Sequence, residues 1–171
     1  EVEHPGPAGD VNLAFNNAQI VHRGTDGALH VVFAGRRSAG YLRRGADGRW
    51  REAVDLVVGS ARAPTLVGDE SGRFLAAAWV VGGRLECRVS QDGGTTWATA
   101  ATVAEADRIV APSLRCVPGP EPGLVAAWHE GDDKRTSDVR ASTWQDGAWS
   151  KPVGLDDGKA SSCFVSLGGR G

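Results

Sequence analysis

Charged side chains that could hold a polar ligand occur in four short segments of this 171-residue sequence. Arginine binds carboxylates through two parallel hydrogen bonds, and aspartate or glutamate accepts hydrogen bonds from hydroxyl groups. If the fold brings the four segments together, they favour an acidic or polyhydroxyl ligand such as a sugar. The candidate ligand-binding residues are Arg36, Arg37, Arg62, Asp107, Arg108, Glu130 and Asp133.

The acidic run from Glu130 to Asp133 has three interpretations. A solvated loop is the usual structure of such a run. Glu130 and Asp132 could instead form the pair of carboxyl groups that glycoside hydrolysis needs. Asp132 and Asp133 could also ligate Ca²⁺, which prefers carboxylate and carbonyl oxygens. No other cofactor is indicated, because His129 does not have the spacing of a metal site.

The composition limits the classes of partner and the compartment. A net charge of −2 gives no basic surface for nucleic acid, and no apolar run is long enough for membrane insertion. The sequence starts at Glu1 without a leader, so we expect a mature or trimmed chain and infer a secreted or extracytoplasmic location. Cys87, Cys116 and Cys163 fit either one disulfide plus a thiol or three buried thiols.

The same order of four short strands occurs three times, which predicts an all-β protein. The first strands start at Ala18, Ala63, Ala111 and Ala160, which are 45, 48 and 49 residues apart. Glycine-containing turns separate the strands, and this period is typical of four-stranded antiparallel propeller blades. We therefore expect one domain over 1–171. Its repeats lie at about 17–61, 62–109 and 110–158, and a further blade starts at 159–171.

The second strand of each repeat, at 28–33, 74–80 and 123–128, is the most apolar. This pattern predicts a central strand in each blade, covered on both faces by neighbouring blades. The third strands, at 40–44, 84–90 and 137–144, are more polar and are expected nearer the periphery. Trp79 and Trp128 occupy matching second-strand positions and are predicted to be in the core.

One turn carries a recognisable motif, Ser90-Gln91-Asp92-Gly93-Gly94-Thr95-Thr96-Trp97, and shortened copies occur at Asp47–Trp50 and Asp146–Trp149. The motif resembles the Asp box of the BNR-repeat β-propellers, whose best-known members are the sialidases. In that family the boxes lie opposite the ligand face, so the resemblance implies structural roles for these residues. They are Ser90, Asp92, Gly94, Thr96, Trp97, Asp47, Trp50, Asp146 and Trp149.

The resemblance to sialidases extends only in part to their catalytic residues. The resemblance matches Arg62, in the segment Ala61-Arg62-Ala63-Pro64, with the first carboxylate-binding arginine of the family. Tyr41 is the only tyrosine and lies in a repeat where the family's nucleophile is not expected, so we interpret it as a blade-surface aromatic. Arg62, Tyr41, Glu130 and Asp132 are therefore weak catalytic candidates, and no complete catalytic set is present.

The resemblance implies a carbohydrate-binding propeller that is not catalytic in this chain. An exo-acting glycoside hydrolase completed by a second chain or a missing segment is one alternative, and a protein-interaction scaffold is the other. Three complete blades do not close a ring, because propellers use about four to eight. We therefore expect a six-bladed ring, formed either by a homodimer or as part of a longer propeller.

Overall fold

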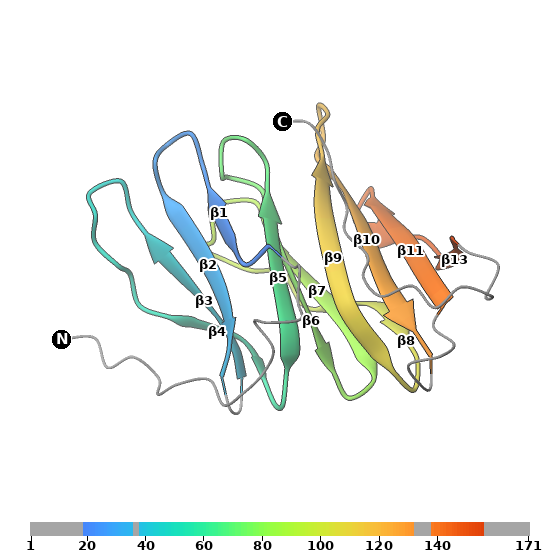
Figure 1. Ribbon diagram of the computed structural model, residues 1–171. Helices are drawn as coiled ribbons and strands as arrows, with labels where there is room; N and C mark the ends of the chain where they lie inside the picture. The colour runs from blue at the N-terminus through green and yellow to red at the C-terminus, as the bar shows by residue number, and fades with distance from the viewer. Residues whose placement is uncertain (1–18, 36–37, 132–137, 156–171) are drawn as a thin grey trace.

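The computed structural model describes residues 19–35, 38–131 and 138–155. These residues form only β-strands and loops, arranged as three antiparallel sheets that stand side by side (Figure 1). The prediction of an all-β chain of antiparallel sheets is therefore confirmed. Within the described ranges, no helix is long and apolar enough to cross a membrane.

Each sheet is formed by one continuous stretch of chain, and we call the three sheets blade 1, blade 2 and blade 3. Blade 1 contains β1 (Val21–Arg23), β2 (Leu29–Ala34), β3 (Ser38–Arg44) and β4 (Val54–Val58). Blade 2 contains β5 (Arg62–Gly68), β6 (Leu75–Val81), β7 (Arg84–Ser90) and β8 (Ala101–Glu105). Blade 3 contains β9 (Ile109–Val117), β10 (Gly123–Glu130), β11 (Asp138–Gln145), β12 (Ala148–Trp149) and β13 (Val153–Gly154).

In blades 1 and 2 the strands follow one another in space as they do in sequence, so each is a simple meander. Blade 3 has the same order from β9 to β11, and β12 and β13 both pair with β11. The turns between first and second strands lie along the upper edge of Figure 1, and we call this edge the upper end. In a meander the turns between third and fourth strands lie at that same end. The links between second and third strands, and between blades, lie at the opposite or lower end. The meander therefore places the Ser90–Trp97 turn and the segments around Arg62 and Arg108 at opposite ends.

The core consists of two apolar layers, one between each pair of neighbouring blades. The side chains of β6 alternate between them, with Leu75, Ala77 and Trp79 facing blade 1 and Ala76, Ala78 and Val80 facing blade 3. Strand β6 is buried on both faces, as its continuous apolar run predicts, because it has a packed blade on each side. Burial of both faces is the main force that holds three separate sheets together.

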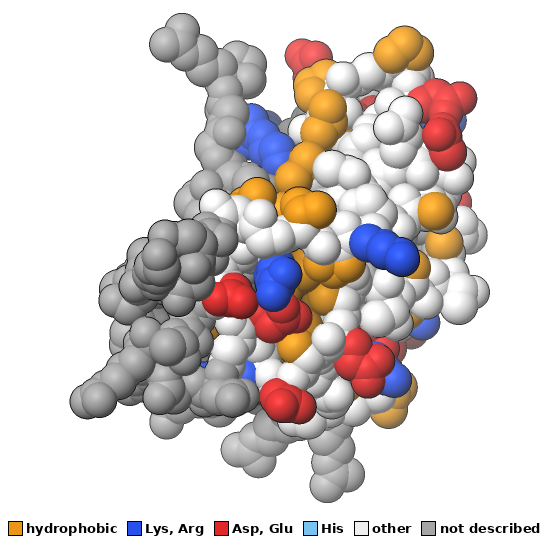
Figure 2. Space-filling view, turned by 90° about the vertical axis from the view of Figure 1, so that its right-hand side faces the viewer, with side chains coloured by type: hydrophobic (Ala, Val, Ile, Leu, Met, Phe, Trp, Pro, Cys, Tyr) orange, Lys and Arg blue, Asp and Glu red, His pale blue; other side chains and the backbone are white. Residues whose placement is uncertain are grey.

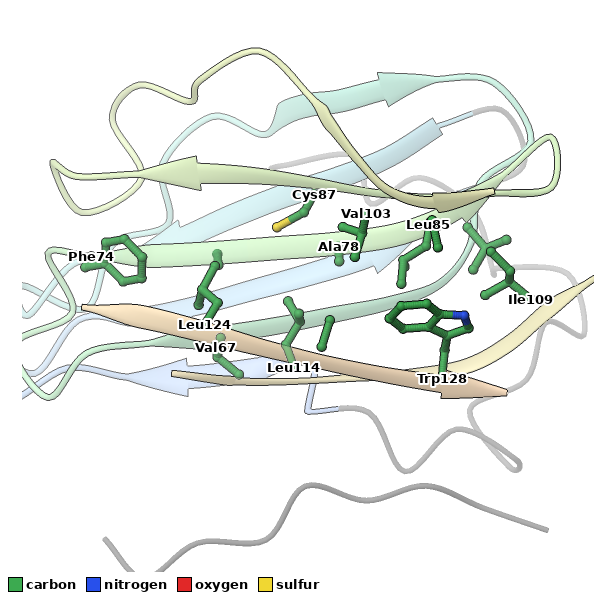
Figure 3. Packing of buried hydrophobic residues seen from close by; sticks show 14 residues of the cluster. Val67, Phe74, Ala78, Leu85, Cys87, Val103, Ile109, Leu114, Leu124 and Trp128 are labelled. Carbon is green, nitrogen blue, oxygen red and sulfur yellow. The ribbon is translucent and has the colours of Figure 1, made fainter. Parts of the chain in front are cut away.

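The two core tryptophans occupy matching places in successive blades. Trp79 and Trp128 are 1% and 0% exposed, so the prediction that both are core residues is confirmed. Figure 3 shows the Trp128 ring extending from β10 toward Leu85. Each ring belongs to the apolar layer that its blade shares with the preceding blade. Tryptophans at this position therefore join each blade to the one before it.

The first strand of blade 1 begins later than predicted, at Val21 instead of near Ala18. The backbone carbonyl of Gln19 accepts a 2.6 Å hydrogen bond from the amide of Leu66 in blade 2. The backbone of Gln19 is therefore bonded to the next blade, while its side chain donates a 3.0 Å hydrogen bond to the carbonyl of Val21 in its own blade. Cys87 and Cys116 are free thiols, and Cys163 lies outside the described residues.

Candidate ligand face

Four of the predicted ligand-binding residues lie at the lower end of blades 2 and 3. Arg62 begins β5, Asp107 and Arg108 immediately precede β9, and Glu130 ends β10. Strands β5 and β9 lie side by side, and the Arg62 guanidinium donates a long 3.5 Å hydrogen bond to the carbonyl of Ile109. Because Ile109 pairs with Glu130 across the sheet, the fold brings Arg62 and Glu130 into one region.

A strained backbone conformation separates Arg62 from the rest of β5. Ala63 has a φ of 50°, and the pairing of β5 with β6 shifts between Arg62 and Thr65. A left-handed conformation costs a residue with a side chain about 1–2 kcal/mol. Ala111 has a φ of 48° at the corresponding bulge of β9. Two bulges at matching positions indicate that the lower ends of the first strands are built in a specific shape.

A short sequence pattern marks both bulges, although the apolar pattern of the strands does not show them. Both left-handed alanines precede a proline, in Ala63-Pro64 and Ala111-Pro112. Proline lacks the amide proton that a regular strand pairing requires, so a bulge is a natural place for it. A repeated Ala-Pro pair could therefore have located the irregular part of both first strands.

The carboxylate of Glu130 is already paired with an arginine of its own blade. Glu130 Oε2 lies 3.1 Å from Arg140 Nε, and Asp138 Oδ2 lies 3.2 Å from Arg140 Nη2. The amide of Gly131 donates a 3.2 Å hydrogen bond to the carbonyl of Arg108, which joins the link before β9 to the end of β10. Arg140, which the sequence analysis did not select, is thus neutralised by two carboxylates. Asp107 and Arg108 are exposed.

The other predicted ligand-face residues lie outside the described residues. These are Arg36 and Arg37 between β2 and β3, and Asp132 and Asp133 between β10 and β11. The Ca²⁺ hypothesis and the Glu130–Asp132 pair therefore stay predictions. Within 19–35, 38–131 and 138–155, no group of three or more potential metal ligands is present.

Tyr41 is a core residue, so its interpretation as a blade-surface aromatic is wrong. Its side chain is 2% exposed and lies between blades 1 and 2. Tyr41 Oη shares a 2.7 Å hydrogen bond with His30 Nδ1 and donates at 3.3 Å to the carbonyl of Gly93. Burial raises the pKa of Tyr41 well above its usual value. The strand pattern missed this because it does not show which faces a neighbouring blade will cover.

This environment also argues against Tyr41 as a nucleophile. A nucleophilic tyrosine must reach its substrate, but the Tyr41 side chain is only 2% exposed. Its hydroxyl is hydrogen-bonded inside the protein to a histidine nitrogen and a backbone carbonyl. Tyr41 also contacts the Ser90–Trp97 turn at the upper end, whereas Arg62 and Arg108 lie at the lower end. Tyr41 and Arg62 therefore do not share a site.

The Ser90–Trp97 turn is closed by hydrogen bonds to two of its own side chains. Asp92 Oδ1 accepts from the amide of Thr96 at 2.9 Å, and Asp92 Oδ2 accepts from the Thr96 hydroxyl at 2.6 Å. Ser90 Oγ accepts from the amide of Gly94 at 2.9 Å and donates to Asp92 Oδ1 at 2.8 Å. The hydrogen bonds from Thr96 lower the pKa of Asp92 to about 2.

The shortened turns are closed by fewer bonds. Asp47 Oδ1 accepts from the amide of Arg49 at 3.0 Å. Asp146 and Gly147 have φ values of 53° and 82°, as in the tight turn that joins two antiparallel strands through Asp-Gly. These turns are hairpin connections at the upper end. Their aspartates serve to form the turns.

The tryptophans of the turns in blades 2 and 3 pack toward the preceding blade. Trp97 meets Tyr41 of blade 1 edge to face, with ring centroids 5.0 Å apart. Trp149 packs against the apolar layer between blades 2 and 3. Trp50, at the equivalent place in blade 1, is 45% exposed. Its exposure follows from its position on the flank that faces away from blade 2.

Comparison with known proteins gives a likeness to solved structures. No protein-family model and no curated protein match the chain. Among solved structures, the chain matches a mutant of the NanB sialidase from Streptococcus pneumoniae, with a TM-score of 0.57 and 14% sequence identity. The match covers 78% of this chain and 22% of that chain. The likeness is one of fold.

The three sheets are therefore β-propeller-like blades that share their arrangement with part of a sialidase structure. The likeness carries no information about individual residues at 14% identity. The chemistry of this face depends on Arg62, Arg108 and their neighbours.

Proposed function

We propose that this chain binds a carboxylate-bearing carbohydrate at the lower end of its blades, with Arg62 as the main anion ligand. The observation that carries the proposal is the environment of the Arg62 guanidinium. It is exposed beside the neighbouring first strand, its hydrogen bond to a carbonyl is long, and no carboxylate pairs with it within the described residues. Arg140, by contrast, is neutralised by Glu130 and Asp138.

The surroundings of Arg62 supply groups for the rest of such a ligand. Arg108 adds a second exposed guanidinium, and Asp107 adds a carboxylate that can accept hydrogen bonds from sugar hydroxyls. A carbohydrate with both a carboxylate and hydroxyl groups would use both kinds of contact. The fold likeness to a sialidase agrees with a ligand of this class.

Binding without turnover is the function that this chain supports best. Its only tyrosine is Tyr41, which is buried at the other end of the blades. Glu130 Oε2 is already engaged by Arg140 Nε at 3.1 Å, so this carboxylate is occupied within its own blade. A glycoside hydrolase and a protein scaffold are the competing functions that the following experiment separates.

The test is titration of the chain with 3′-sialyllactose and with lactose, measured by calorimetry. We expect sialyllactose to bind and lactose to bind at least tenfold more weakly. Arg62→Ala should weaken sialyllactose binding about tenfold or more, because a charge-assisted bidentate contact is lost. Arg62→Lys should recover only part of the affinity, since lysine cannot form the bidentate contact.

Arg51→Ala is the matched control, because Arg51 is exposed and lies next to Asp47 at the upper end. It changes the net charge equally and should leave binding unchanged. If Arg51→Ala and Arg62→Ala weaken sialyllactose binding equally, the change in net charge explains the loss and Arg62 is not a specific ligand-binding residue. Hydrolysis of a fluorogenic sialoside would favour the glycoside hydrolase, and no response to either sugar would favour the scaffold.

We also propose that a second copy of the chain covers the open flanks of blades 1 and 3. Trp50 is 45% exposed where Trp97 and Trp149 are packed against a preceding blade, and Val58, Val153 and Leu155 are 83%, 57% and 58% exposed. Figure 2 shows hydrophobic side chains spread over the flank beside blade 3. Apolar flanks of this kind are a liability in water unless they are covered.

Light scattering at micromolar concentration should give a mass of about twice the 17.9 kDa of one chain. Trp50→Arg should shift the mass to that of a single chain, because an arginine would be buried without a partner. Arg23→Ala, at an exposed position of β1, should leave the mass unchanged. A monomer mass for the unmodified chain would contradict the second-copy proposal.

A further inference from the structure

A groove at the upper end separates blades 2 and 3. Its volume is about 430 Å³, and it is continuous in its lining with a wider groove, since Gln91, Trp144 and Gly147 border both. The volume lies within the range of about 300–1,000 Å³ that is usual for small-ligand sites. This groove lies at the opposite end of the blades from Arg62.

The groove exists because different side chains fill the junction between blades 1 and 2 and the equivalent junction between blades 2 and 3. Between blades 1 and 2, the Tyr41 ring lies against Trp97 and its hydroxyl reaches Gly93. In blade 2 the position of Tyr41 is occupied by Cys87. Tyr41 pairs with Val32, and Cys87 pairs with the corresponding residue Ala78. A cysteine fills much less volume than a tyrosine.

The turn of blade 3 is also too short to close the gap. In blade 2, eight residues from Ser90 to Trp97 form the turn that covers Tyr41. In blade 3, Asp146 and Gly147 alone separate β11 from β12. The small Cys87 and the short turn together leave a space, with the Cys87 side chain at its base.

Three tryptophans from two blades line this space. Trp97 belongs to blade 2, while Trp144 and Trp149 belong to blade 3, and all three are partly exposed. Indole faces stack on the apolar C–H faces of sugar rings while polar groups bind the ring hydroxyls. Gln91 and Thr99 are exposed at the rim and can supply those polar contacts.

The charge of the lining selects among possible ligands. All of the residues that line the 430 Å³ groove are neutral, whereas the ligand face contains Arg62, Asp107 and Arg108. An ionised ligand would lose its hydration in the groove without gaining a partner of opposite charge. We propose that this groove is a second binding site, specific for a neutral saccharide of β-linked hexoses with flat, C–H-lined ring faces.

The probe for this site is cellotetraose, a neutral β-linked tetrasaccharide, added to the full chain. We expect calorimetric binding and a change in tryptophan emission, because the ligand would cover the indoles. Gln91→Ala should weaken binding about fivefold through loss of one hydrogen bond. Trp144→Ala should weaken it about tenfold or more, as loss of an aromatic contact at the centre of an interface commonly does.

Controls separate this site from the ligand face and from loss of folding. Arg62→Ala should leave cellotetraose binding unchanged, so failure of the Arg62 proposal does not decide this one. Thr102→Ala, at an exposed position of β8 outside the groove, should also bind normally. If Trp144→Ala fails to fold by circular dichroism, Gln91→Ala and Thr99→Ala test the site, because both residues are exposed.

The proposal is overturned if cellotetraose does not bind, or if it binds equally well to Gln91→Ala and Thr99→Ala. Binding of decaproline in place of cellotetraose, at the same tryptophans, would also overturn it and assign the groove to extended peptides. Filling the groove with Cys87→Tyr should abolish cellotetraose binding while the chain stays folded.

Discussion

Replacing Gly94 with alanine should destabilise the chain by about 3 kcal/mol, one of the largest effects expected of a single methyl group. Gly94 has a φ of 81°, which a residue with a side chain adopts at a cost of about 1–2 kcal/mol. In addition, a Cβ atom at this position would overlap the ring of Tyr41. Chemical denaturation of the variant and the unmodified chain measures the difference.

Gly93→Ala is the matched control for this variant. Gly93 also has a positive φ, 70°, but a Cβ there would meet its nearest atom, the carbonyl oxygen of Gly72, at 3.5 Å. Gly93→Ala should therefore lower the free energy of unfolding by only about 1 kcal/mol, the cost of the left-handed backbone conformation. In a Tyr41→Ala background, Gly94→Ala should fall to a similar cost, because the ring is gone. Equal losses for Gly93→Ala and Gly94→Ala in the unmodified background would show that Tyr41 does not press on this turn.

The second large effect concerns acid, because stability should fall by about 3 kcal/mol between pH 6.5 and pH 4. His30 is fully buried, and burial lowers its pKa from 6.5 to about 4, with further lowering by Arg43 and His22 and an opposing effect of Asp26. Above pH 6.5 the imidazole is neutral in both states. Below pH 6.5 the imidazole of His30 is protonated in the unfolded chain, whereas in the folded chain it stays neutral down to about pH 4. Folding therefore becomes less favourable as the pH falls through this range.

The measurement is the free energy of unfolding at several pH values, for the unmodified chain and for His30→Gln. The steep fall between pH 6.5 and pH 4 should disappear in His30→Gln, even though the loss of the Tyr41 contact lowers its stability at pH 7. Asp92→Asn tests a separate window, since the Asp92 pKa lies near 2 and its contribution is present above about 3.8 and lost below it. If the pH dependence of stability is the same in His30→Gln as in the unmodified chain, His30 is not the cause of the loss in acid.

Both predictions concern one junction, where blade 1 meets the turn of blade 2. His30, Tyr41 and Gly93 form a continuous set of hydrogen bonds there, and Trp97 closes it from the side. The equivalent junction between blades 2 and 3 has no counterpart of Tyr41 among its described residues, because Cys87 occupies that place. The same repeat therefore forms a filled junction between blades 1 and 2 and an open groove between blades 2 and 3.

The local structure of the blades can be predicted from the amino-acid sequence alone. The third strand of the second repeat is predicted at 84–90 and β7 spans Arg84–Ser90, and the all-apolar run near Trp79 is the buried strand β6. The side-chain hydrogen bonds that close the Ser90–Trp97 turn are equally local, because those of Asp92 and Ser90 reach no further than four residues along the chain. Periodicity and turn chemistry act over a few residues, so they can be read without the fold.

Which residues from different strands and blades lie close together depends on the tertiary structure. Tyr41 is buried because a neighbouring blade covers its face of β3, and Glu130 is paired because β11 brings Arg140 beside it. Arg62 lies near Ile109 because two first strands 47 residues apart run side by side. Such contacts depend on how whole sheets stack, and that packing is set by many distant side chains together. The sequence therefore specified the blades, whereas the stacking of the blades brought together the residues of the candidate ligand face and of the groove between blades 2 and 3.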